Sequence, residues 1–374
     1  MVGTQETGNE TYVKYLIQAL QRLDRPDVQF DVLQTGESTS PLDPDLPTRG
    51  FRLLQVRPAH SVGRICWGIP NLVRQEQVDV LHMTYNAPFW TQQSAQVVMV
   101  HDLAYKLYPR YYAPRVRLVL STLVPLSARR AERVVVPSEQ TKKDVAREYG
   151  VPEFKIVVTP EAAAPEFRLI EGRARLAATL TRYGIDKPYI LAVGNLEPRK
   201  NLARILRVYA ALLQIGTLAH RLVIVGQAHW QGSAVGQAIK QYGLEQNVVL
   251  TGYVPTEELV DLYNEASVFC YPSLYEGFGL PILEGMSCGA PVITSRVASM
   301  PEVAGDAACL IDPTSEQELA QALERILTDD GLRREMRAEG LRRAASFNWE
   351  RTAERTLLAY EEAQSEHSRK RQVA

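Results

Sequence analysis

Two glutamates bracket a glycine-rich stretch in the second half of the chain, YEGFGLPILEGMSCG. Glu276 precedes Gly-Phe-Gly-Leu-Pro, and Glu284 follows it eight positions later. The apolar run SVFCYPS before this stretch predicts a buried strand, and the spacing of Leu280, Leu283 and Met286 after it predicts a helix. Open α/β sheets bind ligands at the carboxyl ends of their strands. The pattern therefore predicts a ligand site with a carboxylate on either side of a flexible turn.

The glycines and the helix start in this stretch suit an anion. Gly277 and Gly279 let backbone N–H groups approach a ligand with no Cβ in the way, and a helix start favours a negative charge by about 0.3–1 kcal/mol. A diphosphate fits there, and carboxylates packed against it do not. We therefore expect Glu276 to accept hydrogen bonds from a sugar and Glu284 from a ribose. A tight strand-to-helix turn with two solvated glutamates gives the same spacing.

A second strand, turn and helix, YILAVGNLEPRKNLARIL, carries two adjacent cations at Arg199 and Lys200. They stand at the start of a helix, where their charges oppose the helix dipole unless an anion lies between them. A bidentate guanidinium and a compact ammonium both suit a phosphate. The pair therefore predicts an anion site, and exposed solubilising charges are the alternative reading.

Short apolar runs alternate with helical patterns along the chain. The runs are VQFDVL, VDVLHM, QVVMVH and RVVVPS in the first half, then YILAVG, RLVIVG, NVVLTG, SVFCYPS and APVITS in the second. This alternation predicts parallel sheets covered by helices on both faces, and 374 residues are too many for one compact domain. We expect an α/β protein with a doubly wound parallel sheet in each of two domains. The first domain would span residues 1–165, a linker 166–187 and the second domain 188–347.

The first domain has an anomaly at its start. A doubly wound sheet usually opens with a strand, yet this chain enters at once a helix with Tyr12, Leu16 and Leu20 on one face. Either the opening strand is missing from this gene model or the domain tolerates its loss. We favour a start codon assigned too far downstream, and we expect the chain without a central strand to be poorly stable.

The composition gives no indication of a nucleic-acid partner, a cysteine metal site or a disulfide framework. Lys and Arg (42) nearly balance Asp and Glu (43), so the overall charge does not indicate a nucleic-acid partner. The four cysteines show neither a metal-ligand spacing nor a disulfide framework, and they suit a reducing compartment: Cys66, Cys270, Cys288 and Cys309. The sequence has no long apolar run and no signal-peptide pattern at its start. We expect a cytoplasmic protein, and any contact with the plasma membrane would be peripheral and on its inner face.

Several segments together resemble a known family. They are GNLEPRKN, TGYV and the E-x7-E pattern of Glu276 and Glu284 in the second half, HDLAYKLYP and VVVPSEQTKKDV in the first, and SFNWERTAERTLLAY near the end. In their order along the chain these segments resemble the retaining glycosyltransferases of family 4, and the GNLEPRKN variant is similar to mannosyltransferase-like members. The resemblance implies the GT-B fold, in which two Rossmann-like domains face a central cleft. It also implies a C-terminal helix, here residues 348–366, that crosses back to the first domain.

The resemblance implies a role for each matching residue of the donor site. Arg199 and Lys200 would neutralise the donor diphosphate, Glu276 would orient the transferred sugar, and Glu284 would bind the ribose. The remaining donor-site positions are those of the phosphate loop, the diphosphate turn and the base pocket: Gly277, Phe278, Gly279 and Leu280, then Gly194, then Tyr253 and Val254. Many family members have Arg directly after the first Gly of GNLEPRKN, where this chain has Asn195. Arg199 would then carry more of the diphosphate charge.

In the first domain the resemblance singles out three positions. His101 with Asp102 matches the loop that contacts the donor sugar near the reaction centre, and Gly8 matches a glycine loop that faces acceptor and diphosphate. His82 has no such support, and we expect it to serve packing. We expect Arg199, Lys200, Glu276 and His101 to carry the chemistry.

The implied reaction is hexosyl transfer with retention of anomeric configuration. A double displacement would need an enzyme nucleophile, and the sequence offers no convincing one. The resemblance instead implies front-face substitution, in which the leaving diphosphate oxygen helps to deprotonate the acceptor. No Asp-x-Asp metal motif follows a strand, so we expect no metal and no cofactor beyond the nucleotide sugar. GDP-mannose is the preferred donor, UDP-glucose stays open, and the acceptor would be a glycan or a lipid-linked saccharide.

Other readings stay open. The stretch PRYYAPRVRLVLSTLVPLSARRAERV mixes arginines with tyrosines and apolar residues, as in a helix that lies on an anionic membrane, but a buried helix with charged ends looks similar. An epimerase or a non-catalytic protein of the same fold would bind the same nucleotide sugar. A nicotinamide-dependent dehydrogenase is disfavoured because no G-x-G-x-x-G follows a strand.

Overall fold

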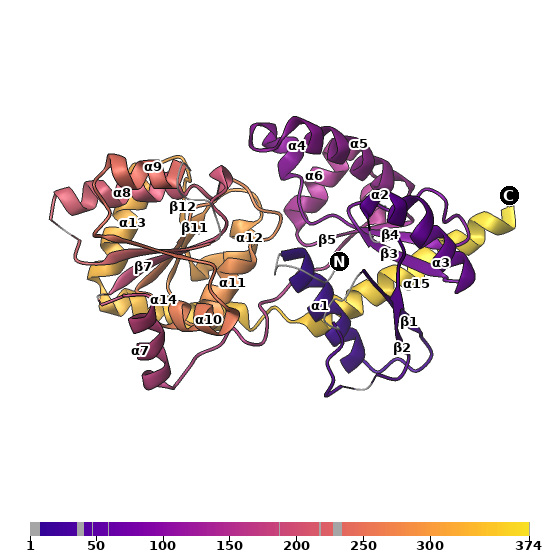
Figure 1. Ribbon diagram of the computed structural model, residues 1–374, viewed down its shortest axis with the longest axis horizontal. Coiled ribbons are helices and arrows are strands. Elements are labelled where there is room, and N and C mark those ends of the chain that lie inside the picture. Colours follow the sequence, from indigo (N-terminus) through magenta and orange to yellow (C-terminus); the bar gives the residue numbers. More distant parts are fainter. Residues whose placement is uncertain are drawn as a thin grey trace. The chain divides into compact units, whose positions relative to one another are not determined.

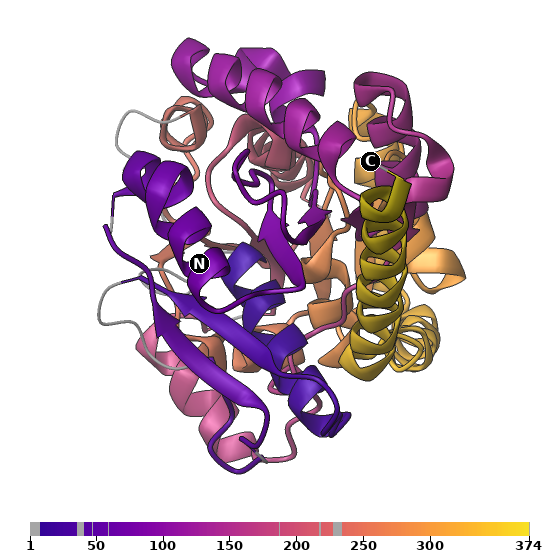
Figure 2. The same cartoon turned by 90° about the vertical axis from the view of Figure 1, so that its right-hand side faces the viewer.

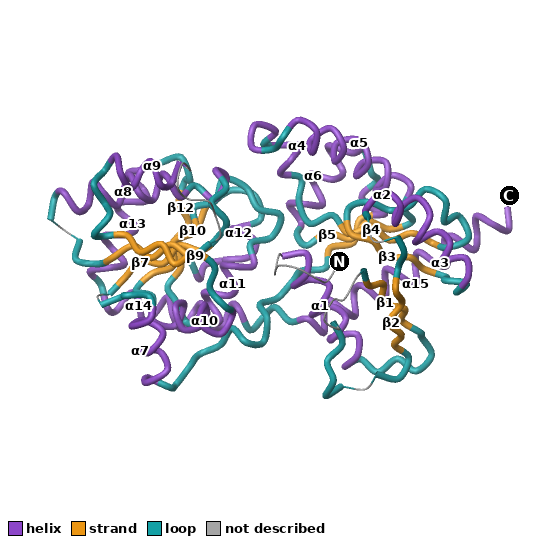
Figure 3. The backbone as a smooth tube through the Cα atoms, viewed as in Figure 1, coloured by secondary structure: helices purple, strands orange, loops and turns teal. Residues whose placement is uncertain are grey.

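The computed structural model describes residues 8–35, 41–46, 48–58, 60–186, 188–216, 218–226 and 234–373. The chain divides into two compact units (Figure 1). The first unit comprises Met1–Glu161 and Asn348–Ala374, and the second comprises Ala162–Phe347. In each unit helices surround the strands, as the sequence pattern predicts (Figure 3).

The second unit is built on a parallel sheet of six strands in the order β12-β11-β10-β7-β8-β9. The strands are β7 (Tyr189–Val193), β8 (Arg221–Val225), β9 (Val248–Gly252), β10 (Val268–Tyr271), β11 (Val292–Ser295) and β12 (Cys309–Ile311). Strands β10 and β11 are buried along their whole length, because helices cover both faces of the sheet. The first strand of this unit, β7, lies in the middle of the sheet. Strands β8 and β9 follow on one side of it, and β10, β11 and β12 follow on the other.

Ten helical segments of the second unit lie within the described residues. They are α7 (Arg173–Arg182), η4 (Pro198–Lys200), α8 (Leu202–Gln214), α9 (Ala234–Gln241), α10 (Thr256–Glu265), α11 (Leu280–Ser287), α12 (Met300–Ala304), η5 (Gly305–Ala307), α13 (Glu316–Thr328) and α14 (Asp330–Ala344). Helix α8 buries Ile205, Leu206 and Tyr209 in the core that it shares with α9 and α13. Within residues 166–187, where we expect a linker, helix α7 packs on α10: Thr179 Oγ1 donates to Asp261 Oδ2 at 2.7 Å.

The first unit contains two separate parallel sheets. Strands β1 (Phe30–Gln34) and β2 (Phe51–Gln55) form one, and β3 (Val80–Thr84), β4 (Ala95–Met99), β5 (Arg133–Val136) and β6 (Ile156–Val158) form the other in this order. Its helices are α1 (Gly8–Arg22), α2 (Ser61–Gly63), η1 (Arg64–Gly68), α3 (Ile69–Gln75), α4 (Ala104–Leu107), η2 (Pro109–Tyr111), α5 (Pro114–Arg130), α6 (Glu139–Tyr149), η3 (Glu153–Lys155) and α15 (Trp349–Val373).

The two sheets of the first unit differ in size and in burial. Strands β1 and β2 pair with each other, while β3 to β6 form a four-stranded sheet. Strands β1 and β3 are mostly half-buried, whereas β4 is buried along its whole length.

Helix α15 returns the end of the chain to the first unit. It packs along α1 and against β4 and β5, and Figure 2 shows it (yellow) as one continuous helix. Trp349 stacks on Tyr15 with 5.8 Å between ring centroids, and the Thr352 hydroxyl donates to the backbone oxygen of Pro160 at 2.5 Å. The aromatic start of α15 therefore fastens this helix to α1 and to the end of β6.

Candidate functional site

The candidate donor site lies where the strand order of the second unit reverses. Strand β7 pairs with β8 on one side and β10 on the other, so the loops after β7 and β10 leave the sheet side by side at its carboxyl edge. Open α/β sheets bind ligands at such a switch point. The loop 194–201 follows β7 and carries Arg199 and Lys200, and the loop 272–279 follows β10 and carries Glu276.

The structure brings the predicted cations and the first glutamate into direct contact. Lys200 Nζ donates to Glu276 Oε1 at 2.8 Å, and Arg199 Nη1 donates to Glu276 Oε2 at 2.5 Å. Ser273 Oγ also donates to Glu276 Oε1, at 2.5 Å, and Tyr271 OH lies 2.6 Å from Lys200 Nζ. All three charged side chains are largely buried. We call Arg199, Lys200 and Glu276 the charge cluster.

Backbone contacts hold the two loops of the charge cluster together. Arg199 O accepts from Leu274 N at 2.8 Å, while Arg199 Nη1 donates to Tyr275 O at 3.1 Å. Asn201 adopts a left-handed conformation with φ of 63° at the start of α8, and its Nδ2 donates to Pro272 O at 3.1 Å and Pro313 O at 2.7 Å. Asn201 therefore ties the cation-bearing turn to the end of β10.

The charges of the cluster shift one another's protonation. Burial alone would raise the pKa of the Glu276 carboxyl, but the charges of Lys200 and Arg199 outweigh burial and lower that pKa to about 2. Burial lowers the pKa of the Lys200 ammonium, and Glu276 opposes this effect. Glu276 is therefore a carboxylate across the physiological pH range.

The glycine-rich loop after β10 has the backbone shape that a close ligand approach requires. Gly279, the residue before α11, has φ of 108°, a value that favours glycine, and Leu280 begins the helix. Phe278 is buried, with 5.9 Å between its ring centroid and that of Phe347. The Ser299 hydroxyl lies 2.9 Å from Glu276 O and 2.7 Å from Phe278 O, so α12 fixes the loop that contains Gly277.

The turn after β7 also depends on glycine. Gly194 has φ of 146°, and a Cβ added at the facing Gly226 would lie 2.1 Å from Gly194 O. The close approach of the ends of β7 and β8 therefore requires glycine at position 226, whereas glycine at position 194 is favoured by its backbone conformation. Asn195, where many family members have arginine, is exposed at this turn.

The second glutamate has a different environment from the first. Glu284 lies on α11, and its Oε2 accepts from Tyr263 OH of α10 at 3.2 Å. Burial of the carboxyl raises the pKa of Glu284 to about 7. Tyr253 follows β9 with 55% of its surface exposed, whereas its neighbour Val254 is buried.

The remaining predicted residues belong to the first unit. His101 follows β4; its Nδ1 lies 3.1 Å from Glu161 Oε1, and its ring meets that of Tyr12 edge-on at 4.9 Å. Asp102 Oδ1 accepts from Ala104 N at 2.9 Å at the start of α4. Gly8 begins α1, the helix that carries Tyr12.

His82 is a packed side chain of β3, as expected. Its Nδ1 lies 2.7 Å from Tyr360 OH of α15. Burial, with His101 nearby, lowers the pKa of His82 to about 4, so the imidazole is neutral at physiological pH.

Sequence reasoning missed four polar side chains that support the site. Tyr271 and Ser273 stand beside Glu276 at the end of β10, Asn201 follows Lys200, and Tyr263 reaches Glu284 from α10. Asn201 and Ser273 lie within three positions of predicted residues, which is a usable signal. Tyr263 has no such signal, because its contact depends on the packing of two helices.

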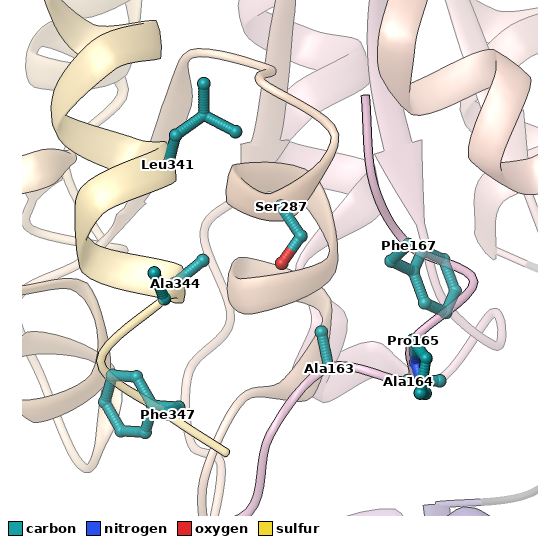
Figure 4. Close-up of a pocket in the computed structure, with 9 residues that line it drawn as sticks. Ala163, Ala164, Pro165, Phe167, Ser287, Leu341, Ala344 and Phe347 are labelled. Carbon is teal, nitrogen blue, oxygen red and sulfur yellow. The ribbon is translucent and has the colours of Figure 1, made fainter. Parts of the chain in front are cut away.

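An apolar pocket elsewhere in the second unit contains none of the predicted donor-site residues. Its lining comes from the segment 163–167, α11 and the end of α14 onward: Ala163, Ala164, Pro165, Phe167, Ser287, Leu341, Ala344, Ala345 and Phe347 (Figure 4). It offers one hydroxyl and no charged side chain, so it does not suit a diphosphate.

Membrane-spanning helices and disulfides are both absent from the described residues. No helix in this part of the chain combines the length and apolar character needed to cross a bilayer. The four cysteines are free thiols, at Cys66, Cys270, Cys288 and Cys309.

The fold and the charge cluster together define a class of protein: an α/β protein of two Rossmann-like units with a cluster of buried charges at the switch point of the second. Residues 182–343 match the family model described as "Glycosyl transferases group 1", and residues 7–167 match "Glycosyltransferase Family 4". The O-antigen chain mannosyltransferase B of Escherichia coli is 34% identical over 266 residues, or 71% of this chain and 69% of that protein. The chain therefore belongs to glycosyltransferase family 4, and it is a glycosyltransferase.

Further comparisons agree with this family and fold. The serotype-specific mannosyltransferase WbdA of Escherichia coli is 30% identical over 227 residues, or 60% of this chain and 28% of that protein. Sucrose-phosphate synthase from Thermosynechococcus elongatus has a similar structure, with a TM-score of 0.75 at 22% identity over 96% of this chain and 94% of that one. Anabaena Alr3699/HepE, solved in complex with UDP and glucose, gives 0.71 at 17% identity over 96% of each chain. The expected GT-B fold class is confirmed.

Proposed function

We propose that this glycosyltransferase moves a hexose, with mannose as the favoured sugar, from a nucleoside-diphosphate sugar to a glycan or lipid-linked acceptor. The observation that carries the proposal is the charge cluster at the switch point, where two cations suit a diphosphate and one carboxylate suits sugar hydroxyls. The names of the two Escherichia coli relatives, both mannosyltransferases, favour mannose as the sugar, and GDP-mannose is the donor we propose for it. The UDP and glucose in the HepE complex keep UDP-glucose as the second donor to test.

The proposed reaction keeps the configuration of the sugar by front-face substitution. The bond from the anomeric carbon to the diphosphate oxygen breaks, a bond to the acceptor oxygen forms on the same face, and the acceptor proton passes to the leaving diphosphate. Lys200 and Arg199 would stabilise the charge that grows on this leaving group. Glu276 is a poor nucleophile here, because two cations and Ser273 already engage its oxygens. Its proposed task is to orient the sugar.

The other predicted residues would complete the donor site. The loop of Gly277 and Gly279 would bring backbone N–H groups to the phosphates, Glu284 would accept from the ribose, and the exposed ring of Tyr253 would contact the base. His101, from the first unit, is proposed to contact the donor sugar. We further propose that the reaction needs no divalent ion, because Arg199 and Lys200 supply the positive charge.

The test is a transfer assay with GDP-mannose and UDP-glucose, an oligosaccharide acceptor, and a product whose anomeric configuration is assigned by NMR. We expect one donor to give a retained product, the same rate in EDTA, and a rate lower by about 10²–10³ in Lys200→Ala. An isomerised donor formed without acceptor would indicate an epimerase instead. Nucleotide binding without turnover would indicate a non-catalytic protein, and loss of activity in EDTA that magnesium restores would refute metal independence.

We also propose that helix α5 docks the enzyme on an anionic membrane surface, on the cytoplasmic face. The first half of α5 is exposed, apolar and basic: Leu118 is 69% exposed, and Val116, Val119, Arg115 and Arg117 are exposed beside it. Exposed apolar side chains next to arginines suit an anionic lipid surface. A fully buried helix would not present them.

Sedimentation with vesicles tests the membrane proposal. We expect binding to vesicles that contain phosphatidylglycerol, little binding to pure phosphatidylcholine, and a loss of binding in the double variant Leu118→Ser/Val119→Ser. Phe154→Ser is the matched control, because Phe154 is 73% exposed in the same unit but lies on η3. Equal binding by the double variant and the wild type would refute the role of α5.

A further inference from the structure

Both oxygens of Glu276 are occupied in this structure. Lys200 and Ser273 donate to Oε1, and Arg199 donates to Oε2. Carboxylates and phosphates both accept charge-assisted hydrogen bonds from arginine and lysine, so the two anions can compete for the same cations. The residue expected to bind the sugar therefore occupies the cations expected to bind the diphosphate.

The four side chains joined by these ion pairs have charges that sum to zero. Arg199 and Lys200 contribute two positive charges, and Glu276 contributes one negative charge. Glu197 contributes the other, because Arg199 Nε donates to Glu197 Oε2 at 3.0 Å. Glu197 is exposed, so solvent screens its charge, whereas Glu276 is buried and ionised. A diphosphate therefore meets a neutralised pair of cations unless Glu276 moves away.

We propose that Glu276 is an internal competitor of the donor diphosphate, which must displace this carboxylate from Arg199 and Lys200 before it binds. The inference rests on the proposed function and adds an order of events to it. The diphosphate takes the two cations, and the released carboxylate then turns to the hydroxyls of the donor sugar. Recognition of the phosphate and orientation of the sugar are coupled through one side chain.

The same exchange separates the donor from the product nucleotide. A released, buried carboxylate is costly unless it finds hydrogen-bond donors. A nucleotide sugar supplies hydroxyls for Glu276, whereas the nucleoside diphosphate left after transfer has no sugar to supply them. After transfer the carboxylate returns to Lys200 and Arg199 and helps to expel the product. The device thus limits inhibition by product.

Inorganic pyrophosphate is the probe that isolates the first step, because it has neither ribose nor sugar. Calorimetry would compare its binding to the wild type and to Glu276→Gln, which removes the competing charge and keeps the shape. A hydrogen bond to a charged group contributes about 1.5–3 kcal/mol, so we expect Glu276→Gln to bind pyrophosphate about tenfold tighter or more. We also expect the preference for nucleotide sugar over nucleoside diphosphate to fall by a similar factor.

Glu197→Gln is the matched control, since it also removes one negative charge that pairs with Arg199. Because Glu197 is exposed and does not contact Lys200, we expect its removal to change pyrophosphate affinity by about twofold at most. An equal gain in both variants would overturn the exchange in favour of a general charge effect. Weaker or unchanged pyrophosphate binding by a folded Glu276→Gln would overturn it outright.

Glu276→Asp keeps the inference testable if the Gln variant does not fold. Its carboxylate is one methylene shorter, so it keeps the charge but holds Lys200 and Arg199 less well, and we expect pyrophosphate affinity between those of wild type and Gln. Affinity equal to the wild type would count against the exchange. If the wild type transfers sugar but neither variant binds pyrophosphate tighter, only this inference fails. If no variant and no wild type binds any nucleotide, the proposed donor site fails as well.

Discussion

Glu276 and Glu284 are the same residue type eight positions apart, yet their neighbours move their pKa values in opposite directions. Cations surround Glu276 and lower its pKa to about 2, whereas burial raises that of Glu284 to about 7. The first is a permanent anion that can exchange between partners. The second changes charge near neutrality, so its ability to accept from a ribose hydroxyl as a carboxylate depends on pH.

Glu284 is expected to make the enzyme less stable as the pH rises. The folded chain keeps the proton of Glu284 up to about pH 7, while the unfolded chain loses it near 4.5, so the free energy of unfolding falls across this window. The difference corresponds to at most about 3 kcal/mol. Glu284→Gln lacks this titration. Urea unfolding at pH 5 and pH 8 should therefore show that the free energy of unfolding falls less with rising pH in the variant than in the wild type.

The Glu276 carboxyl is expected to affect the pH dependence of stability in the opposite direction, and Glu276→Gln tests this. The lowered pKa of Glu276 contributes stability above about pH 4.5 that is lost as the pH falls toward 2, so its removal should cost stability at pH 8. An identical pH dependence in the wild type and Glu284→Gln would show that the carboxyl of Glu284 is not held protonated by the fold.

At the scale of elements, the periodicity of the sequence predicted the strands and helices but not the contacts between them. The runs YILAVG and SVFCYPS became β7 and β10, and the helix after Gly279 became α11, because these patterns record which residues are buried. The adjacency of β7 and β10 was not predictable from either run, since strand order depends on pairing between distant segments. The hydrogen bond between Lys200 and Tyr271 depends on that adjacency, so it could not be read from spacing.

The start of α15 is expected to be a stability determinant of the first unit. Trp349 is buried and packs against Tyr15 and Tyr12, so Trp349→Ala should cost about 3–5 kcal/mol. Leu358→Ala is the control on the same helix, because Leu358 is 57% exposed and its loss should change stability by about 0.5 kcal/mol or less. Calorimetric unfolding would measure both, and equal effects of the two variants would contradict the packing role of Trp349.

At the scale of the whole molecule, the two units differ in how their sheets are completed. The second unit has one continuous six-stranded sheet whose middle positions hold β7 and β10, and the proposed donor chemistry sits on it. The first unit has the pair of β1 and β2 apart from the group of β3 to β6. A continuous, fully covered sheet suits a site that needs fixed loops, because its strand ends are held on both sides.

The separate pair of β1 and β2 also bears on how the protein behaves in solution. The outermost strand of a sheet presents backbone N–H and C=O groups that can pair with another chain, and charged side chains discourage this. Strand β1 carries Asp31 and β2 carries Arg52, which form an ion pair at 2.7 Å. Strand β3, VLHMT, ends its sheet without a charged residue. Self-association at high concentration, by strand pairing between molecules, is therefore expected at uncharged outermost strands such as β3 and β6 rather than at the pair of β1 and β2.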